Sequence, residues 1–355
     1  MKNWYLLLSF LILLLSCDEE PVETVYFNLK GKNGVFITCE GNFMYGNSSL
    51  SFYDKDEKHI YNQLFYARNS APLGDVAQSI TRNGNTIFVS VNNSGKIVGI
   101  NSETAEFKGV IRGLTSPRYM HFISDDKAYV SDLYARAITI VNPTTFSVIG
   151  KIDVSDGKQN YQRHATEQFV QVGNRVFVTC WSNDEYILVI DPENDMVVDS
   201  IKTPFQPKDI LMDINEKIWV MCDGGFEGSV LGEYTPSLLR IDPVTLTIEQ
   251  KYVFPDNIDS PSQLTINSTR DTILFLNGGI FKMDVMSRYL PNKPFLSSNG
   301  NLFYSLDVDP ANDDIYVADA IDYTQSAIIY RYSKNGVLLD SFYVGITPGD
   351  YLFTD

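Results

Sequence analysis

The sequence predicts an all-β protein, a seven-bladed β-propeller, from three observations. A short β-rich motif occurs seven times at intervals typical of propeller blades. No stretch carries the sustained 3.6-residue apolar periodicity of an amphipathic helix. The last residues repeat the first strand of a unit whose remainder is missing, which is how a ring of blades is closed on itself.

The repeated motif is four residues long, with an aromatic or apolar side chain at its second position. Its copies are VFIT (35–38), IFVS (87–90), AYVS (128–131), VFVT (176–179), IWVM (218–221), ILFL (273–276) and IYVA (315–318). Neighbouring copies lie 41 to 55 residues apart, and a four-stranded propeller blade typically takes about 40 to 50 residues. The longer intervals are expected to hold inserted loops.

Each motif has companions that complete a four-stranded blade. A short strand lies about ten residues before it, as in AQSI (77–80) and KDILM (208–212). An alternating strand, a turn and a last strand follow it, as in 137–152 and 187–201. The turns contain Asn-Pro or Asp-Pro, which favour turn initiation between strands.

The end of the chain supplies the strand that the first unit lacks. The first unit begins at GVFIT (34–38), which corresponds to the second strand of the other units. PGDYLF (348–353) resembles the first strand of a unit, as in SPRYMHF (116–122). We therefore expect 348–353 to complete blade 1 and to pair an edge that would otherwise be open.

The first sixteen residues have the pattern of a lipoprotein signal peptide. Lys2 precedes an apolar run from Tyr5 to Leu15, which is shorter than the roughly 20 residues of a membrane-spanning helix. Leu14 to Cys17 resemble a bacterial lipobox, so we expect lipidation at Cys17; the alternative is an ordinary secretory peptide with an incidental cysteine. The predicted organisation is a signal peptide (1–16), a lipidated tether (17–30) and a propeller (31–355).

The acidic residues after the predicted cleavage site bear on localisation. Residues 18–20, DEE, resemble the run that directs lipoproteins of some Gram-negative phyla to the cell surface. In enteric bacteria an Asp at this place instead favours retention at the inner membrane. Three consecutive acidic residues fit the surface signal better, so the expected location is the outer membrane, lipid-anchored and at the cell surface. Within the tether and its continuation, 23–29 is a candidate extra edge strand.

Charge and cysteine content exclude several classes of partner and site. The net charge of −16 argues against nucleic acid and against any membrane contact other than the lipid anchor. Besides Cys17, three cysteines remain: Cys39, Cys180 and Cys222. They follow the motifs of blades 1, 4 and 5, and blades 1 and 4 lie too far apart for one ion to bind all three. We expect small, buried side chains at strand ends.

Loops at one end of the channel are expected to bind a ligand, because the strands are committed to packing. The loops and strand starts there offer aromatic rings, amides, carboxylates and few cations, a mixture that suits a bulky, neutral, polar ligand with flat apolar parts. The predicted ligand-binding residues are Asn92, Asn93, Arg118, Tyr119, Tyr134, Gln168, Trp181, Asp223, Phe226, Asp319 and Tyr323. The strand starts add Gln78, Glu167, Lys208, Asp209, Gln263 and Tyr304 as neighbours of this set.

Enzyme motifs do not point to a reaction. The chain has no G-x-S-x-G or H-E-x-x-H motif, and its three histidines share no metal-ligand spacing. Acidic stretches such as DAIDY (319–323) lack the alternating pattern of a calcium loop. We therefore predict no catalytic residue, no metal and no cofactor. Two alternatives stay open: a hydrolase or lyase with a channel metal held by Glu40, Asp132, Asp223 and Asp319, and an adhesion or scaffold protein.

A set of segments resembles one family of exported propellers. The segments are SPRY (116–119), TEQFVQ (166–171), CWSN (180–183), QPKDI (206–210), CDGGFEGS (222–229), DIYVADAIDY (314–323) and GITPGDYLF (345–353). They are similar to the YncE-like, surface-layer-type propeller lipoproteins of the DUF5074 grouping. The resemblance implies the propeller fold. Because some of these lipoproteins capture corrinoids over a TonB-dependent transporter, it also implies a surface binding protein that delivers a nutrient, with corrinoid (vitamin B12) as the leading ligand.

Overall fold

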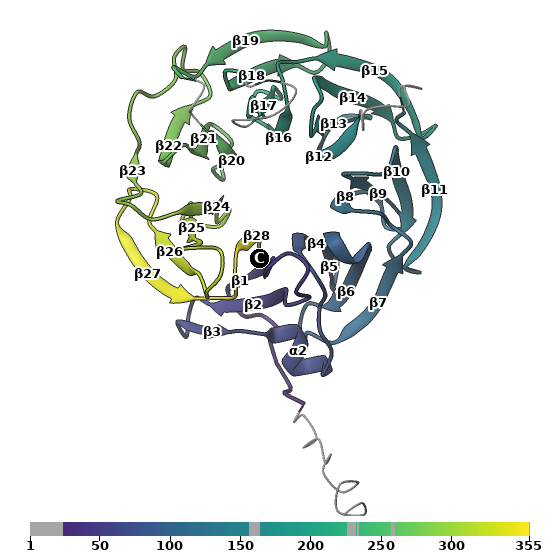
Figure 1. Ribbon diagram of the computed structural model, residues 1–355, viewed down its shortest axis with the longest axis vertical. Helices are drawn as coiled ribbons and strands as arrows, with labels where there is room; N and C mark the ends of the chain where they lie inside the picture. Colours follow the sequence, from purple (N-terminus) through teal and green to yellow (C-terminus); the bar gives the residue numbers. More distant parts are fainter. Residues whose placement is uncertain (1–23, 156–163, 226–231, 233, 257–259, 355) are drawn as a thin grey trace, which may run out of the picture.

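The computed structural model describes residues 24–354 apart from 156–163, 226–231, 233 and 257–259. It is a ring of seven four-stranded antiparallel sheets around a central axis (Figure 1), as the repeats predict. Cys17, the predicted lipidation site, and Phe226, one of the predicted ligand-binding residues, lie outside the described residues. Within the described part of the chain, no helix is long and apolar enough to cross a membrane.

Each blade is numbered here from its innermost to its outermost strand. Blade 1 contains β28 (Pro348–Phe353), β1 (Gly34–Cys39), β2 (Ser49–Asp54) and β3 (His59–Tyr61). Blade 2 contains β4 (Ala77–Asn83), β5 (Thr86–Val91), β6 (Lys96–Asn101) and β7 (Phe107–Arg112). Blade 3 contains β8 (Pro117–Ser124), β9 (Lys127–Asp132), β10 (Ala137–Asn142) and β11 (Ser147–Asp153).

The remaining blades follow the same order around the ring. Blade 4 contains β12 (Ala165–Val172), β13 (Arg175–Trp181), β14 (Tyr186–Asp191) and β15 (Met196–Lys202). Blade 5 contains β16 (Pro207–Met212), β17 (Ile218–Cys222), β18 (Ser237–Asp242) and β19 (Thr247–Val253). Blade 6 contains β20 (Ser262–Ile266), β21 (Thr272–Leu276), β22 (Gly279–Asp284) and β23 (Leu296–Ser297). Blade 7 contains β24 (Phe303–Val308), β25 (Ile315–Asp319), β26 (Ile328–Tyr332) and β27 (Leu338–Tyr343).

The repeated motif is the second strand of each blade, and its second residue packs between blades. These seven side chains are at most 2% exposed: Phe36, Phe88, Tyr129, Phe177, Trp219, Leu274 and Tyr316. The described core forms seven clusters, and each joins two neighbouring blades. The aromatic or large apolar residue of each motif is therefore one of several buried side chains that hold adjacent sheets together.

The ends of the chain close the ring, as predicted. Antiparallel pairing joins Val35 to Phe353 and Thr38 to Asp350, and β28 lies directly beside β1 in Figure 1. The Asp350 N–H donates to Thr38 Oγ1 at 3.0 Å. Between blades 1 and 7, the buried Lys55 Nζ lies 2.7 Å from Asp309 Oδ2. The edge of β1 is thus paired rather than exposed.

Helical structure is sparse but not absent in the described residues. A short 3-10 helix, η1, spans Asn92–Ser94, and a six-residue helix, α2 (Leu64–Asn69), lies between blades 1 and 2. Leu64 and Phe65 bury their side chains there, so this insertion covers apolar surface that the strand pattern did not predict.

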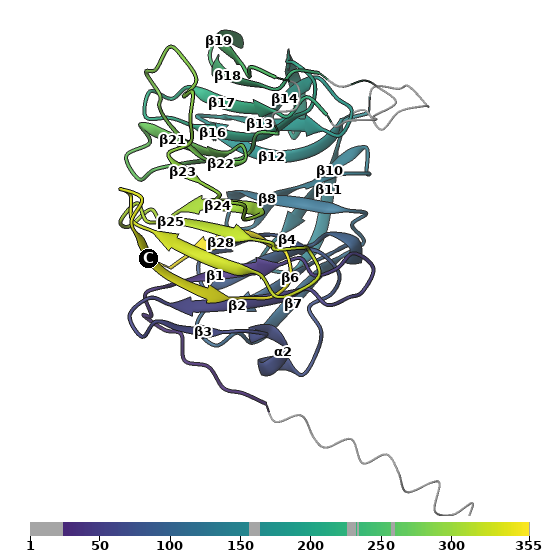
Figure 2. The same ribbon diagram turned by 60° about the vertical axis from the view of Figure 1, so that its left-hand side comes forward.

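The segment before β1 follows the outside of the ring. Residues 24–29 do not form the extra edge strand considered above. The Val25 N–H donates to Ala67 O of α2 at 2.9 Å, and the Arg68 guanidinium lies 4.5 Å from the centre of the Tyr26 ring. Figures 1 and 2 show this segment leaving the ring beside α2, away from the channel axis.

Candidate functional site

Every innermost strand is irregular at the same place, close to its start. In six blades the pairing with the second strand slips immediately after its first paired residue, and in blade 4 it slips after the second, Thr166. The first residues of the seven slips are Gly349, Gln78, Arg118, Glu167, Lys208, Gln263 and Tyr304. Bulges re-aim side chains and are frequent beside binding sites, so seven aligned bulges define one end of the channel.

A cavity of about 450 Å³ lies at this end of the channel. All of the bulge residues except Glu167 line it. Its wall is completed by Tyr119 of β8, Trp181 at the end of β13, Asn92 of η1 and the loop residues Glu40, Gly41, Phe43, Val76, Leu133, Tyr323 and Thr347. Because every blade contributes, the cavity lies on the ring axis. Its size falls in the range of about 300 to 1,000 Å³ that is usual for small-molecule sites. We call it the mouth cavity.

A buried ion pair fixes one side of the mouth cavity. The Arg118 guanidinium donates to both oxygens of Glu167, from Nε at 2.7 Å and from Nη2 at 2.6 Å. Arg118 is 8% exposed and Glu167 is fully buried. The remaining Nη1 donates to Gln78 Oε1. This bidentate pair neutralises the guanidinium and holds it in one orientation.

Glu40 and Tyr304 form a second polar group on the cavity wall. The Tyr304 hydroxyl donates to Glu40 Oε1 at 2.9 Å. Burial raises the pKa of Glu40, and this effect outweighs the hydrogen bond and the charges of Arg118 and Lys208, which lower it. The carboxyl group is therefore easier to protonate than an exposed glutamate.

Trp181 presents a flat ring between two cations. Lys208 Nζ lies 5.2 Å and Arg118 Cζ 5.7 Å from the ring centre, both within cation–π range. The indole Nε1 donates to Asp223 Oδ2 at 2.8 Å, which fixes the plane of the ring. Lys208 makes no ion pair with any described residue, so its ammonium is the cation best placed to meet an incoming acceptor.

The predicted residues fall into three groups. Asn92, Arg118, Tyr119, Trp181 and Tyr323 line the mouth cavity. Gln168 and Asp223 lie behind its wall, where Gln168 Nε2 donates to the Tyr119 hydroxyl at 3.3 Å and Asp223 accepts the bond from Trp181.

The third group lies in turns around the rim. The Asn93 amide donates to Asp75 Oδ2 at 2.5 Å, and the Tyr134 N–H donates to Asp132 Oδ1 at 3.0 Å. Asp319 Oδ1 accepts the N–H groups of Leu302 and Ile321, each at 3.0 Å. These contacts stabilise loops beside the cavity.

The predicted set leaves out half of the polar lining. Glu40, Gln78, Lys208, Gln263 and Tyr304 all line the cavity. The last four occupy the position after the first paired residue of an innermost strand. The sequence analysis named them as strand-start neighbours of the set, and their shared register was the signal that could have moved them into it.

The four carboxylates of the channel-metal alternative do not form one donor group. Asp132 accepts four backbone N–H groups, from Thr115, Ser116, Tyr134 and Ala135. Asp223 accepts the indole N–H of Trp181, and Asp319 accepts the backbone N–H of Leu302. Among the described residues, the one group of three candidate metal ligands lies elsewhere, in blade 4.

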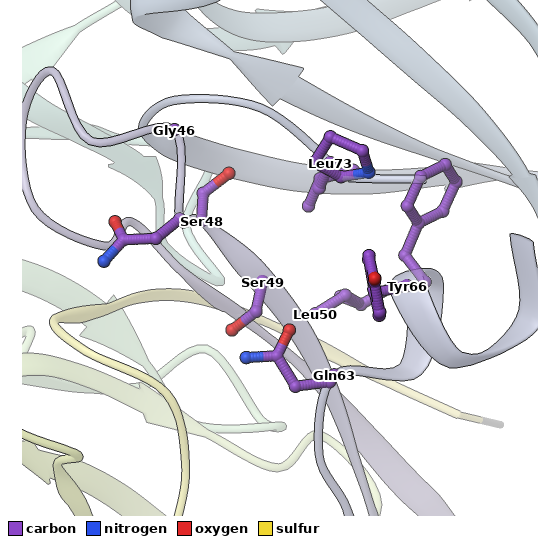
Figure 3. A pocket seen from close by; sticks show the side chains of 10 residues that line it. Gly46, Ser48, Ser49, Leu50, Gln63, Tyr66 and Leu73 are labelled. Carbon is purple, nitrogen blue, oxygen red and sulfur yellow. The ribbon is translucent and has the colours of Figure 1, made fainter. Parts of the chain in front are cut away.

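A second, smaller cavity of about 170 Å³ lies between β2 and α2. Figure 3 shows Ser49, Gln63, Tyr66 and Leu73 around it. It shares no lining residue with the mouth cavity and belongs to a single insertion rather than to all blades. The mouth cavity is therefore the better candidate site.

Comparison with solved structures shows the same fold at low sequence identity. A periplasmic gluconolactonase of Pseudomonas aeruginosa has 12% identity and a TM-score of 0.68, covering 91% of this chain and 99% of that one. A quinonprotein alcohol dehydrogenase-like protein of Bacteroides thetaiotaomicron has 13% identity and a TM-score of 0.67, covering 93% and 79%. Apo AztD of Citrobacter koseri has 12% identity and a TM-score of 0.56, covering 93% and 98%.

These similarities identify the architecture and leave the activity to be argued from the site. No curated protein matches the sequence significantly. A family described as a domain of unknown function, DUF5074, matches residues 33–344, which is nearly the whole propeller and agrees with the resemblance of the loop segments. The chain therefore belongs to the DUF5074 family of β-propellers.

Proposed function

We propose that the mouth cavity binds a small-molecule nutrient, and that the protein is a lipid-anchored binding protein of the cell surface. In this proposal it delivers the nutrient to a TonB-dependent outer-membrane transporter, and a corrinoid is the leading ligand. The observation that carries the proposal is the row of aligned bulges, which directs side chains from five of the seven innermost strands into one cavity, while Gly349 lines it with backbone. The lipobox ending at Cys17 and the acidic run 18–20 support the location.

The chemistry of the cavity suits a large ligand with both flat and polar parts. Trp181, Tyr323 and Phe43 supply aromatic surface, while Gln78 and Gln263 supply amides that donate and accept. Phe43 is 65% exposed, although its loop is fixed by the Met44 N–H donating to Asp75 Oδ2 at 2.9 Å. An exposed aromatic ring on a braced loop can cover one face of a ligand at little entropic cost.

Calorimetric titration of the full-length protein in detergent with cobinamide and with cobalamin tests the proposal. We expect binding by the wild type, a loss of at least about tenfold in affinity for Trp181→Leu and Lys208→Gln, and no change for Lys108→Gln on outer strand β7. Absence of heat with both corrinoids would remove the corrinoid assignment. Unchanged affinity in both cavity variants would place the ligand elsewhere.

A second candidate is an enzyme that uses Glu40 as a proton donor. A carboxyl with a raised pKa beside a tyrosine hydroxyl is a recurring acid–base arrangement. The gluconolactonase with the same fold suggests lactone hydrolysis as the first assay. Turnover of δ-gluconolactone by the wild type that is lost in Glu40→Gln would favour this function, and turnover no faster than the buffer blank would exclude lactone hydrolysis.

A further inference from the structure

Blade 4 brings three different metal-ligating side chains together outside the mouth cavity. His164 directly precedes β12, Cys180 lies near the end of β13, and Asp184 lies in the turn that leads to β14. One donor atom from each lies within 4.8 Å of the other two. Cys180 is fully buried, Asp184 is 2% exposed, and the His164 side chain is 14% exposed.

The imidazole of His164 has an unsatisfied nitrogen at this place. Its Nδ1 is buried and has no hydrogen-bond partner, although it lies 3.0 Å from Asp184 Oδ2. A buried nitrogen lone pair facing a carboxylate oxygen is repulsive unless a proton or a metal ion lies between them, and an unpartnered buried polar atom is costly. A metal ion bound to both atoms would give Nδ1 the partner that it lacks.

We propose that His164, Cys180 and Asp184 bind one zinc-like divalent cation. Imidazole, thiolate and carboxylate are the three side-chain ligands that zinc takes, at about 2.0 to 2.3 Å. The three donor atoms already lie within 4.8 Å of one another, and Nδ1 and Oδ2 are 3.0 Å apart, so modest side-chain movements would bring all three to one ion. Three protein ligands leave the fourth tetrahedral position for water.

The surroundings of the group provide both access and rigidity. His164 lines a cavity of about 390 Å³ together with Val154 of blade 3 and Leu188 of blade 4, which gives an ion a way in. The Glu185 N–H donates to Asp184 Oδ1 at 2.7 Å, and the His164 N–H donates to Asp184 Oδ2. These bonds orient the carboxylate before an ion arrives.

The other two cysteines show that this arrangement is specific to blade 4. Cys39, Cys180 and Cys222 occupy equivalent positions, each on the second strand opposite the last residue before the bulge. All three are fully buried and unpaired. Among the described residues, only Cys180 belongs to a group of three candidate ligands. Cys39 and Cys222 are therefore matched controls.

Co²⁺ is the probe for the test, because a thiolate ligand gives it a near-ultraviolet charge-transfer band. The full-length protein in detergent is titrated with Co²⁺ and then with Zn²⁺. We expect one equivalent of Co²⁺ to bind with this band, Zn²⁺ to displace it, and about one proton to be released per ion as the thiol ionises. Cys222→Ser should behave as the wild type.

Two variants make the result decisive. Cys180→Ser should abolish the band, and His164→Asn should weaken Co²⁺ binding by more than the 10- to 100-fold that is typical of losing an outer-shell partner. Asn tolerates the left-handed backbone of His164 (φ +61°), and the variant leaves the buried thiol of Cys180 in place. If Cys180→Ser does not fold, Co²⁺ binding by His164→Asn alone tests the proposed site. A folded wild type without the band, or a band unchanged in His164→Asn, would overturn the proposal. None of these readouts depends on the mouth cavity.

Discussion

Two neighbouring positions at the bulge of each innermost strand differ in role. The first position is the first residue of the bulge, such as Lys208, and the next position is the residue after it, such as Asp209. At the first position, the bulge directs residues such as Lys208 and Tyr304 into the mouth cavity. At the next position, Asp350, Gln168 and Asp209 accept N–H groups from the innermost strand of the following blade, at 2.9, 3.1 and 3.2 Å.

The difference separates recognition from ring assembly within a single strand. Side chains at the second position bond to groups that would otherwise be buried without a partner, so their loss should destabilise the ring. Apart from the Arg118–Glu167 pair, side chains at the first position face the cavity and can change with little effect on folding. The predictions below test this division.

The largest effect is expected from removing the closing strand. Deletion of residues 346–355 leaves the edge of β1 unpaired and opens the interface between blades 1 and 7. We expect loss of cooperative unfolding or a large fall in Tm, measured by circular dichroism. An unchanged melting curve would show that the seam, the pairing of β28 with β1, contributes no more to stability than a surface loop.

The next largest effect is expected from breaking the buried ion pair between Arg118 and Glu167. Glu167→Gln leaves the Arg118 guanidinium buried without its counter-charge, and breaking a buried pair costs about 3 to 5 kcal/mol. Denaturant unfolding measures the loss. The double variant Arg118→Gln/Glu167→Gln should recover part of it, and equal stability of the single and double variants would contradict the role of the uncompensated charge.

The adjacent pair Lys208 and Asp209 compares the two positions directly. Asp209→Ala removes the acceptor of the Leu264 N–H and of the Gln168 amide, so we expect a loss of about 2 kcal/mol or more. Lys208→Ala should change the free energy of unfolding by less than about 0.5 kcal/mol. Similar losses in the two variants would contradict the division of roles.

The last prediction concerns the dependence of stability on pH. Burial raises the pKa of Asp350 to about 7 and that of Asp307 to about 6, above their values of about 4 in an unfolded chain. The stability that each contributes is therefore complete below about pH 4 and is lost as the pH rises through 6 and 7. Burial lowers the pKa of His121, which acts in the opposite direction over part of this range.

Comparison with Asp307→Asn isolates this contribution. Urea unfolding at pH 5 and at pH 8.5 should show a smaller loss of stability in Asp307→Asn than in the wild type. The variant keeps an acceptor for the Thr265 hydroxyl, which donates to Asp307 Oδ1 at 2.6 Å. Identical pH dependence in the two proteins would mean that Asp307 does not titrate in this range.

The sequence predicted the ring because each unit repeats a buried residue at one register position. Phe36, Tyr129 and Trp219 occupy that position and are buried. The segment 348–353 could pair only with the first unit, because that unit lacked an innermost strand. The bulges were not predictable, because a slip of register changes which face a side chain occupies without changing its identity. The predicted ligand-binding set therefore mixed loop residues with three from strand starts, Arg118, Tyr119 and Gln168. Lys208 and Tyr304 were named only as neighbours of that set.

Helix α2 and the group of possible metal ligands in blade 4 were not predicted, for different reasons. Leu64 and Phe65 fall in a helix of only six residues, too short for an apolar period to be recognised. His164, Cys180 and Asp184 come together only because β12 and β13 are paired, and their sequence spacing matches no common metal motif.

The closing strand also imposes an order of events on assembly. Thr38 and Asp350 are in contact across 312 positions of the chain, so the seam cannot form until all the intervening blades have been synthesised. Contacts of such long range are slow to form. Until they do, β1 presents a bare edge to neighbouring molecules, and a chain interrupted before residue 348 retains that edge permanently. A nascent molecule therefore passes through a period in which most of its blades can be built while it is still open to aggregation or proteolysis.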